Sequence, residues 1–293
     1  MPGCIERKIN RLSGHRGRAV RPRVLDLFSG CGGLSLGFAA AGFEIVTAME
    51  TDPIAARTHA DNLHKGLPHD VIAQHARTRD VSQEDPEQIA REFYKGRPED
   101  AFDVIIGGPP CQAYARIGRA KLRAVGEDPF AYTKDRRAGL YLRYLEYIHS
   151  LRPLALLMEN VPDILNFSGR NIVEEMLGPL NRMGYEAAYS LINSAHHGVP
   201  QMRDRIYLIA FRKELGAAVR FPDASHRCDL PSGYMGMRSV ALKLVSRGQG
   251  GGYQQADTGV RTLPPAVSAS EAMADLPMID GKRNSLARRA ARM

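Results

Sequence analysis

The chain has 293 residues, enough for one large α/β domain with an appendage or for two modest domains. Hydrophobic residues make up 44% of it, which excludes wholesale disorder, and no apolar run approaches the ~20 residues of a membrane-spanning helix. Its formal charge of +8 suits a polyanionic partner, although many soluble proteins are mildly basic without one.

The N-terminal stretch is strongly basic. Residues 6–23 carry seven basic side chains and one acidic side chain, and they include no apolar segment of the kind that a signal peptide needs. We expect a solvated, mobile arm over residues 1–22, and an arm that binds nucleic acid is the alternative.

From residue 23 onwards, apolar runs alternate with segments that carry helical signals. Strands are predicted at 23–28, 44–50, 70–74, 101–108, 153–160, 186–194 and 204–211. Helices are predicted at 34–43, 52–62, 84–94, 136–151 and 171–185. Asp52 is the expected N-cap of the second helix, with Pro53 in its first turn. Continuous apolar strands that alternate with helices indicate an α/β fold with a doubly wound, mostly parallel sheet.

After residue 212 the sequence changes character. It becomes loop-like and rich in glycine, holds one short helical stretch at 270–277, and ends in a basic segment. We therefore expect a core domain over residues 23–212 and a loop-rich extension over residues 213–293.

Four cysteines lie far apart, at positions 4, 31, 111 and 228. They form neither a CxxC pair nor a zinc-binding spacing, so no bound metal is expected. Individually placed thiols are typical of a reduced protein in the cytoplasm.

A glycine-rich turn follows the first predicted strand, and ligands of doubly wound sheets bind at the carboxyl ends of the strands. Gly30 and Gly32 let the backbone approach a ligand closely, but Ser35 stands where a dinucleotide fingerprint needs its third glycine. Glu50 can bind a ribose diol, and Asp80 can accept a hydrogen bond from an adenine amine. These residues favour S-adenosylmethionine (SAM) over NAD, and a structural turn with surface acids is the alternative.

A cysteine follows two prolines at the end of a predicted buried strand. Pro109 and Pro110 stiffen the backbone, so Cys111 would be held rigidly at the carboxyl edge of the sheet. A thiolate nucleophile needs such a position, whereas a buried structural cysteine is the alternative. Glu159 ends the next strand at the same edge, where it can act as a proton donor; a capping network with Asn160 is its alternative.

Two arginines lie two residues apart where the last strand begins. Arg203 and Arg205 would share a face of that strand and could hold a phosphate or a carbonyl group, although ordinary edge-strand charge explains them as well. A thiol, a carboxyl group and paired guanidinium groups together suit attack on an electron-poor ring. Cys111 would add to C6 of cytosine, Glu159 would protonate or hydrogen-bond N3, and C5 would then attack the methyl group of SAM.

These segments resemble the DNA cytosine-5 methyltransferase family in their order and spacing. The first motif is matched by DLFSGCGGLSLGF, the catalytic-loop motif by PPCQAYARIGR, the glutamate motif by ENV and the arginine motif by QMRDRIYLIAF. The resemblance runs from about residue 23 to residue 212, with a weaker match in VSASEAMADLP. It implies the Rossmann-like fold of SAM-dependent methyltransferases, and methyl transfer to a flipped-out cytosine of duplex DNA within a restriction-modification system.

The resemblance also implies roles for individual residues. It assigns catalysis to Cys111, Glu159, Arg203 and Arg205. It assigns the SAM pocket to Phe28, Gly30, Gly32, Glu50, Asp80 and Pro109. It assigns DNA contacts to Gln112, Arg116 and Arg119, in a mobile loop. Double-stranded DNA is the implied partner, and the implied location is the cytoplasm, at the nucleoid.

Family members continue beyond the arginine motif with a recognition region and two closing motifs, the last of which returns to the SAM pocket. Neither closing motif is found in this sequence. We therefore expect one subunit of a split methyltransferase, whose second polypeptide recognises the target, or a truncated product. A degenerate, inactive protein is the alternative.

Other functions compete with this interpretation. A transfer-RNA cytosine-5 methyltransferase of the same fold would share every motif, and a non-catalytic subunit that binds SAM or DNA would not need the thiol. A nicotinamide-dependent oxidoreductase is disfavoured by Ser35 and Cys111. The target sequence is hidden, because base contacts come from the region beyond the arginine motif.

Overall fold

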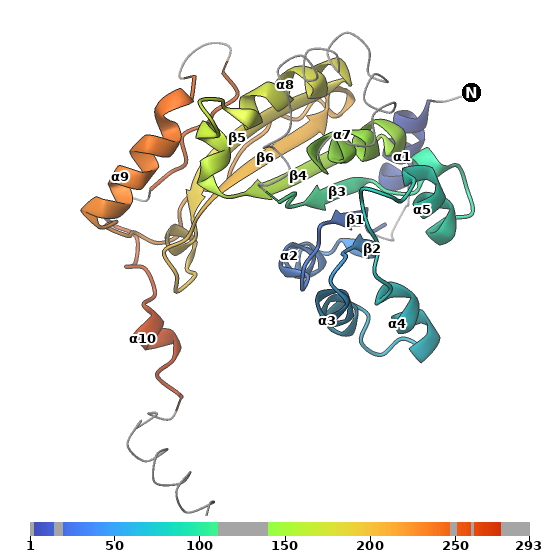
Figure 1. Ribbon diagram of the computed structural model, residues 1–293, viewed down its shortest axis with the longest axis horizontal. Coiled ribbons are helices and arrows are strands. Elements are labelled where there is room, and N and C mark those ends of the chain that lie inside the picture. The colour runs from blue at the N-terminus through green and yellow to red at the C-terminus, as the bar shows by residue number, and fades with distance from the viewer. Residues whose placement is uncertain (1–2, 15–19, 111–139, 247–250, 259–260, 277–293) are drawn as a thin grey trace, which may run out of the picture. The chain divides into compact units, whose positions relative to one another are not determined.

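The computed structural model describes residues 3–14, 20–110, 140–246, 251–258 and 261–276 (Figure 1). The chain divides into two compact units. The first unit holds the central sheet and is drawn from residues 1–192, 204–222 and 230–256. The second unit is drawn from residues 193–203, 223–229 and 257–293.

The described residues form one sheet of six strands in the order β2-β1-β3-β4-β6-β5. These strands are β1 (Arg23–Leu27), β2 (Glu44–Met49), β3 (Val104–Gly107), β4 (Ala155–Asn160), β5 (Tyr185–Asn193) and β6 (Asp204–Arg212). β1 pairs in parallel with β2 and with β3, and β3 pairs in parallel with β4, whereas β6 runs antiparallel to β4. The mostly parallel sheet is thereby confirmed. The chain passes from β1 to β2 on one side and then to β3 on the other, so a topological switch point lies between β1 and β3.

Helices cover both faces of this sheet (Figure 1). The α-helices are α1 (Cys4–Ser13), α2 (Gly33–Ala40), α3 (Pro53–Leu63), α4 (His69–His75), α5 (Pro86–Phe93), α7 (Leu140–Leu151), α8 (Ile172–Arg182), α9 (Ser232–Ala241) and α10 (Ala269–Ala272). Short 3-10 helices are η1 (Pro98–Asp100), η3 (Pro162–Asn166), η4 (Ser194–His197), η5 (Lys213–Leu215) and η6 (Leu242–Leu244). In the described part of the chain, no helix has the length and apolar character needed to cross a bilayer.

Two apolar clusters explain the layers. On one face, Val24, Ile45, Val104 and Ile106 pack against side chains of α2 and α3. On the other face, a larger core joins the strands to α5, α7 and α8. Because both faces of the central strands are buried, their sequences read as continuous apolar runs, and the doubly wound fold is confirmed.

Helix α3 begins as the sequence predicts. The Asp52 carboxylate accepts hydrogen bonds from the N–H groups of Ile54 at 2.8 Å and Ala55 at 2.9 Å, and Pro53 is the first helical residue. This cap satisfies two amides that the first turn of a helix otherwise leaves without partners. It also fixes the direction in which the chain leaves β2.

The strand predicted at residues 70–74 is wrong, because these residues lie in α4. Val71 and Ile72 are half-buried, the next two residues are exposed, and His75 and Ala76 are half-buried again. This spacing follows the turn of a helix and not the two-residue period of a strand. Two adjacent apolar residues in a short window are compatible with either structure, and the pattern of burial decides between them.

The solvated N-terminal arm is also a wrong prediction, at least for residues 4–13, which form α1. The side chain of Lys8 is only 1% exposed. Its Nζ donates hydrogen bonds to the carbonyl oxygens of Phe102 at 2.6 Å, Leu151 at 2.9 Å and Arg152 at 2.8 Å. These partners are at least 94 residues away in the sequence, so a local count of charges does not reveal them.

Candidate active site

The turn that follows β1 needs unusual backbone angles. Gly30 and Gly32 have φ angles of 53° and 92°, in the left-handed region that favours glycine. A Cβ at Gly32 would lie 2.8 Å from Cδ2 of His59, so a larger residue there would displace that ring. Phe28 has a φ angle of 60°, which is strained for an aromatic residue. The three residues predicted for the start of a SAM pocket therefore lie on one constrained turn.

Glu50 follows β2 and contacts this turn directly. Its Oε2 accepts a hydrogen bond from the Gly30 N–H at 2.8 Å, and its Oε1 accepts from the N–H groups of the next two residues at 2.8 and 2.9 Å. A Cβ built on Gly30 would meet no atom within 4 Å, so the turn has open space beside it. The predicted ribose partner and the glycine turn are thus brought together.

The segment that holds Asp80 lies beside the end of β2, because the neighbouring residue, Arg79, is hydrogen-bonded there. The Arg79 N–H donates to the carbonyl oxygen of Glu50 at 2.8 Å. The Asp80 Oδ1 accepts from the Ser82 N–H at 2.8 Å, which closes a turn and fixes the carboxylate. The two acids assigned from the sequence to ribose and adenine therefore lie on adjacent segments at the carboxyl edge of the sheet.

The backbone that precedes Cys111 is anchored by β4. The buried side chain of Asn160 donates from Nδ2 to the Pro109 carbonyl oxygen at 2.7 Å. A Cβ at Gly108 would lie 3.1 Å from Oε2 of Glu159, so the chain leaving β3 runs past that carboxylate. Glycine at this position is what allows the close approach. The proline segment and Glu159 are therefore neighbours.

Glu159 forms an ion pair across β4 and β6. Arg205 Nε lies 2.7 Å from Glu159 Oε1, and the two side chains are 17% and 26% exposed. Arg205 Nη1 also donates to the carbonyl oxygen of Asp204 at 2.7 Å, which restricts the guanidinium further. The pair lies at the carboxyl end of β4, the edge that also carries Pro109.

The remaining predicted residues are Arg203 and four residues beyond Pro110. Arg203 belongs to the second compact unit, where its carbonyl oxygen accepts from the Ser194 N–H at 3.0 Å. Outside the described residues lie Cys111, Gln112, Arg116 and Arg119. Their roles, and that of Arg203, stay predictions.

A buried polar network under the glycine turn escaped the sequence analysis. Ser35 Oγ donates to Asp26 Oδ2 at 2.6 Å, and His59 Nε2 lies 3.1 Å from the same hydroxyl. Burial raises the pKa of the Asp26 carboxyl to about 7 and lowers the pKa of His59 to about 4. The sequence holds one signal for this network, an acid within the apolar strand VLDLF.

A second ion pair, which is more deeply buried, adjoins the first along the chain. Arg238 of α9 binds Asp204, and each of these side chains is 9% exposed. The Tyr234 hydroxyl oxygen accepts from the Asp204 N–H at 3.3 Å. Because Asp204 directly precedes Arg205, α9 fixes the start of β6 and with it the partner of Glu159. Sequence patterns gave no signal for this role, since α9 falls in the expected loop-rich extension.

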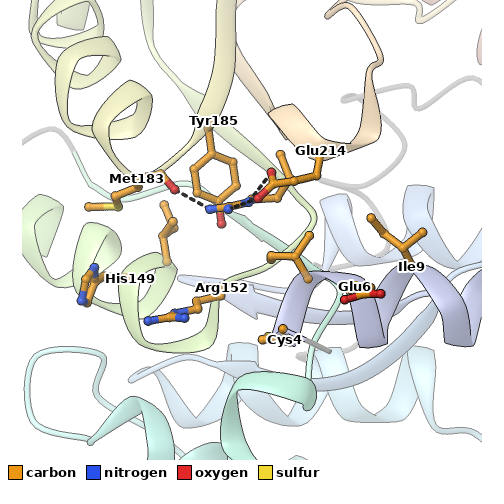
Figure 2. A pocket seen from close by; sticks show the side chains of 12 residues that line it. Cys4, Glu6, Ile9, His149, Arg152, Met183, Tyr185 and Glu214 are labelled. Atoms are coloured by element: carbon orange, nitrogen blue, oxygen red, sulfur yellow. Dashed lines mark hydrogen bonds and ion pairs between the residues drawn. The ribbon is translucent and has the colours of Figure 1, made fainter. Parts of the chain in front are cut away.

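A groove of about 630 Å³ lies at the opposite edge of the sheet (Figure 2). Its walls come from α1, the end of α7, the start of β5 and the end of β6; the labelled side chains include Cys4, His149, Arg152 and Tyr185. None of the predicted active-site residues that the structure describes lines it. Among the described residues, no cluster of His, Cys, Asp and Glu suited to a metal ion occurs.

Known proteins of one family are similar to this chain. Residues 22–240 match the family described as C-5 cytosine-specific DNA methylase. The type II methyltransferase M.OihORF3336P of Oceanobacillus iheyensis is 35% identical over 258 residues, which are 87% of this chain and 54% of that protein. The type II methyltransferase M.AquIA of a Picosynechococcus strain is 30% identical over 259 residues, which are 86% of this chain and 92% of that protein.

A solved structure is similar as well. The crystal structure of a DNA modification methyltransferase encoded within an Escherichia coli prophage has a TM-score of 0.55 and 26% sequence identity, over 88% of this chain and 56% of that one. This chain therefore spans about half the length of M.OihORF3336P and of the prophage protein, and nearly all of M.AquIA.

Proposed function

Because this chain belongs to the C-5 cytosine-specific DNA methylase family, we propose that it transfers a methyl group from SAM to C5 of cytosine in duplex DNA. One observation carries the proposal. The carboxyl edge of a single sheet gathers the glycine turn with Glu50, and the Pro109 segment with the Glu159–Arg205 pair. The first group suits a methyl donor, and the second suits a pyrimidine ring.

The residues around the glycine turn fit SAM. Gly30 has open space where a side chain would stand, Glu50 offers a carboxylate to a ribose diol, and Asp80 offers one to an adenine amine. Ser35 is turned to Asp26 and so does not supply the close approach that a pyrophosphate requires. When bound, SAM supplies an electrophilic methyl group.

The chemistry of the pyrimidine needs a nucleophile and a proton donor. The Cys111 thiolate forms a bond to C6, and the electron pair of the C5–C6 double bond makes C5 nucleophilic toward the methyl group. Arg205 holds Oε1 of Glu159. We assign to Oε2, the oxygen beside Gly108, the donation of a proton or hydrogen bond to N3 as the thiolate adds to C6. A base from solvent then takes the C5 proton, the electron pair of that C–H bond re-forms the C5–C6 double bond, and the C6–S bond breaks to release the thiolate.

The proposed reaction also requires access to the target base and contacts with the DNA backbone. A base stacked in a duplex is out of reach of a protein thiol, so the target cytosine must be flipped out. Gln112, Arg116 and Arg119 contact the DNA, and Arg203 supports the base or the loop. Such a reaction is typical of the modification half of a restriction-modification system, at the DNA in the cytoplasm.

A second polypeptide completes the pocket in this proposal. Leu36 of α2 is 45% exposed and Ile54 of α3 is 77% exposed, and these helices begin beside the glycine turn and Glu50. Apolar side chains at that place are suited to burial under a further element. A relative of nearly this length, M.AquIA, is itself described as a type II methyltransferase. Full-strength SAM binding by the isolated chain would argue against the second polypeptide.

Covalent capture tests the proposed function. The full chain is incubated with SAM and a duplex that contains 5-fluorocytosine, which blocks release of the thiolate from C6. We expect a denaturation-resistant complex with the wild type and with Cys228→Ser, and none with Cys111→Ser. Equal capture by Cys111→Ser would refute the mechanism. Capture of transfer RNA that contains 5-fluorocytidine, without capture of duplex DNA, would instead support the RNA alternative.

A further inference from the structure

His59 of α3 packs against the glycine turn that follows β1. Its ring is 1% exposed, and its Cδ2 lies 2.8 Å from the position that a Cβ at Gly32 would take. Its Nε2 lies 3.1 Å from the Ser35 hydroxyl, at the start of α2. One side chain therefore contacts both the turn after β1 and the helix that follows it.

The hydrogen bonds define how the histidine takes part. Above the pKa of Asp26, about 7, that carboxyl is ionised and Ser35 donates its one hydroxyl proton to Oδ2 at 2.6 Å, so toward His59 it can only accept. The Nε2 of His59 must then carry the proton. Its Nδ1 is buried and has no hydrogen-bond partner among the described residues, as expected for the bare nitrogen of a neutral ring. Burial lowers the pKa of His59 to about 4, which keeps the ring neutral at physiological pH.

Helix α3 is also joined to Glu50, the predicted ribose partner, which in turn binds the glycine turn. Helix α3 starts at Pro53, three residues after Glu50, and Glu50 Oε1 binds the N–H of the capping residue Asp52 at 2.9 Å. Glu50 Oε2 binds the Gly30 N–H at 2.8 Å. Helix α3 is thus linked to the turn at two places, through Glu50 just before its start and through His59 in its second turn.

We propose that His59 is a positioning residue of the methyl-donor pocket, which holds the Gly30–Gly32 turn at the correct distance from Glu50 by donating to Ser35 and packing on Gly32. This inference rests on the proposed function for the identity of the ligand. It predicts that the hydrogen bond to Ser35, and not only the volume of the ring, determines the shape of the turn.

Two measurements on the full chain test the proposal. Equilibrium dialysis with radiolabelled SAM gives the affinity. Alkylation by iodoacetamide, followed by peptide mass spectrometry, gives the reactivity of Cys31, an exposed thiol between the two glycines that reports on the turn without any ligand. The variants are His59→Leu, which lacks the N–H, and His59→Gln, which keeps an N–H donor. The matched control is His69→Leu, at an exposed histidine in α4.

We expect His59→Leu to weaken SAM binding about tenfold and to speed Cys31 alkylation severalfold, since one buried hydrogen bond is lost. His59→Gln should stay within about threefold of the wild type for both, because its amide can still donate to Ser35. His69→Leu should leave both unchanged. If His59→Leu does not fold, Ser35→Ala removes the acceptor instead and should produce the same two changes.

The outcomes separate this inference from the proposed function. Unchanged affinity and unchanged Cys31 reactivity in a folded His59→Leu would overturn the positioning role, as would an equal loss in His59→Gln. Because the isolated chain is expected to bind SAM more weakly than a completed pocket would, dialysis is extended to millimolar SAM; a wild type that binds none even there, with Cys31 alkylation still faster in His59→Leu, would count against the proposed ligand while it supports the role of His59 in holding the turn.

Discussion

Charged side chains at the amino edge of the sheet are bound to fixed partners, whereas those at the carboxyl edge lie beside turns and strand ends. At the amino edge, Arg7 Nε is 2.8 Å from Asp100 Oδ2, and Lys8 Nζ is surrounded by three carbonyl oxygens. At the carboxyl edge, Glu50 binds the amides of a glycine turn, and the Glu159–Arg205 pair remains partly exposed.

The difference separates two uses of charge. The ammonium group of Lys8 binds the carbonyl oxygens that end α7, where a cation also complements the helix dipole, so these hydrogen-bond partners belong to the fold itself. The acids of the carboxyl edge are placed by left-handed glycines and a proline segment, features that rarely serve the core alone. A basic run is therefore a weak sign of nucleic-acid binding, and an acid beside a constrained turn is a stronger sign of a site.

Removal of the cation behind the carboxyl edge should have the largest effect on stability. In Arg238→Met the carboxylate of Asp204 loses the cation of a buried pair, and we expect the free energy of unfolding to fall by about 3–5 kcal/mol. Chemical denaturation of the full chain, followed by circular dichroism, measures the loss. Arg220→Met, at an exposed arginine, should change it by less than about 0.5 kcal/mol.

A double variant sharpens that test. Asp204→Leu combined with Arg238→Met leaves no charge behind, so it should recover much of the lost stability. If the single variant costs less than about 1 kcal/mol, the pair is hydrated in solution, and the carboxyl edge then lacks the fixed support that the amino edge has.

The carboxyl edge was largely predictable from sequence because its signals are local. Glycine, proline and acidic residues stand directly after apolar strands, and parallel strands bring their carboxyl ends to one edge whatever the details of packing. Glu50 and the Gly30 turn, and Glu159 and Arg205, were expected at this edge, and the structure brings each pair into contact.

The other features were hidden because their partners are distant in the sequence. Lys8 meets carbonyl oxygens from two later segments, and Arg238 meets an aspartate 34 residues earlier. His59 carries no local signal beyond its place in a predicted helix, since its contact with Gly32 exists only after α3 packs against the turn. Local pattern gives no information on such pairings.

The pH dependence of stability tests the amino edge. Burial lowers the pKa of Lys8 to about 8 from the ordinary value of 10.5. Below pH 8 both folded and unfolded chains carry this proton. Between pH 8 and 10.5 the unfolded chain keeps a proton that the folded chain has released, so the free energy of unfolding rises with pH, by at most about 3 kcal/mol.

The variant Lys8→Met isolates this contribution. The difference in unfolding free energy between the wild type and Lys8→Met should increase from pH 8 to pH 10. Taking the difference cancels the opposing effect of the buried tyrosines, which are present in both proteins. Lys95→Met, at an exposed lysine, should show no such increase. A flat difference curve for Lys8→Met would contradict the lowered pKa, because it would show that the ammonium group is solvated as well by its three carbonyl oxygens in the folded chain as by water in the unfolded chain.

A pair of glycine variants compares a constrained position with a free one nearby. Gly32→Ala places a side chain at a φ angle of 92° and at 2.8 Å from the His59 ring, so we expect a loss of about 2 kcal/mol in unfolding free energy and weaker SAM binding. Thermal denaturation and equilibrium dialysis measure the two effects. Stability equal to that of the wild type would show that the turn is not constrained as described.

Gly37→Ala gives the smallest effect and has the opposite sign. Gly37 lies inside α2 with a helical backbone, and a Cβ there would meet no atom within 4 Å. Alanine lowers the entropy of the unfolded chain and favours the helix, so the free energy of unfolding should rise by about 0.5–1 kcal/mol. The two substitutions are chemically identical and five residues apart. Opposite signs would therefore establish that the constraint belongs to the turn beneath the site, and a loss in both would place it in α2 as a whole.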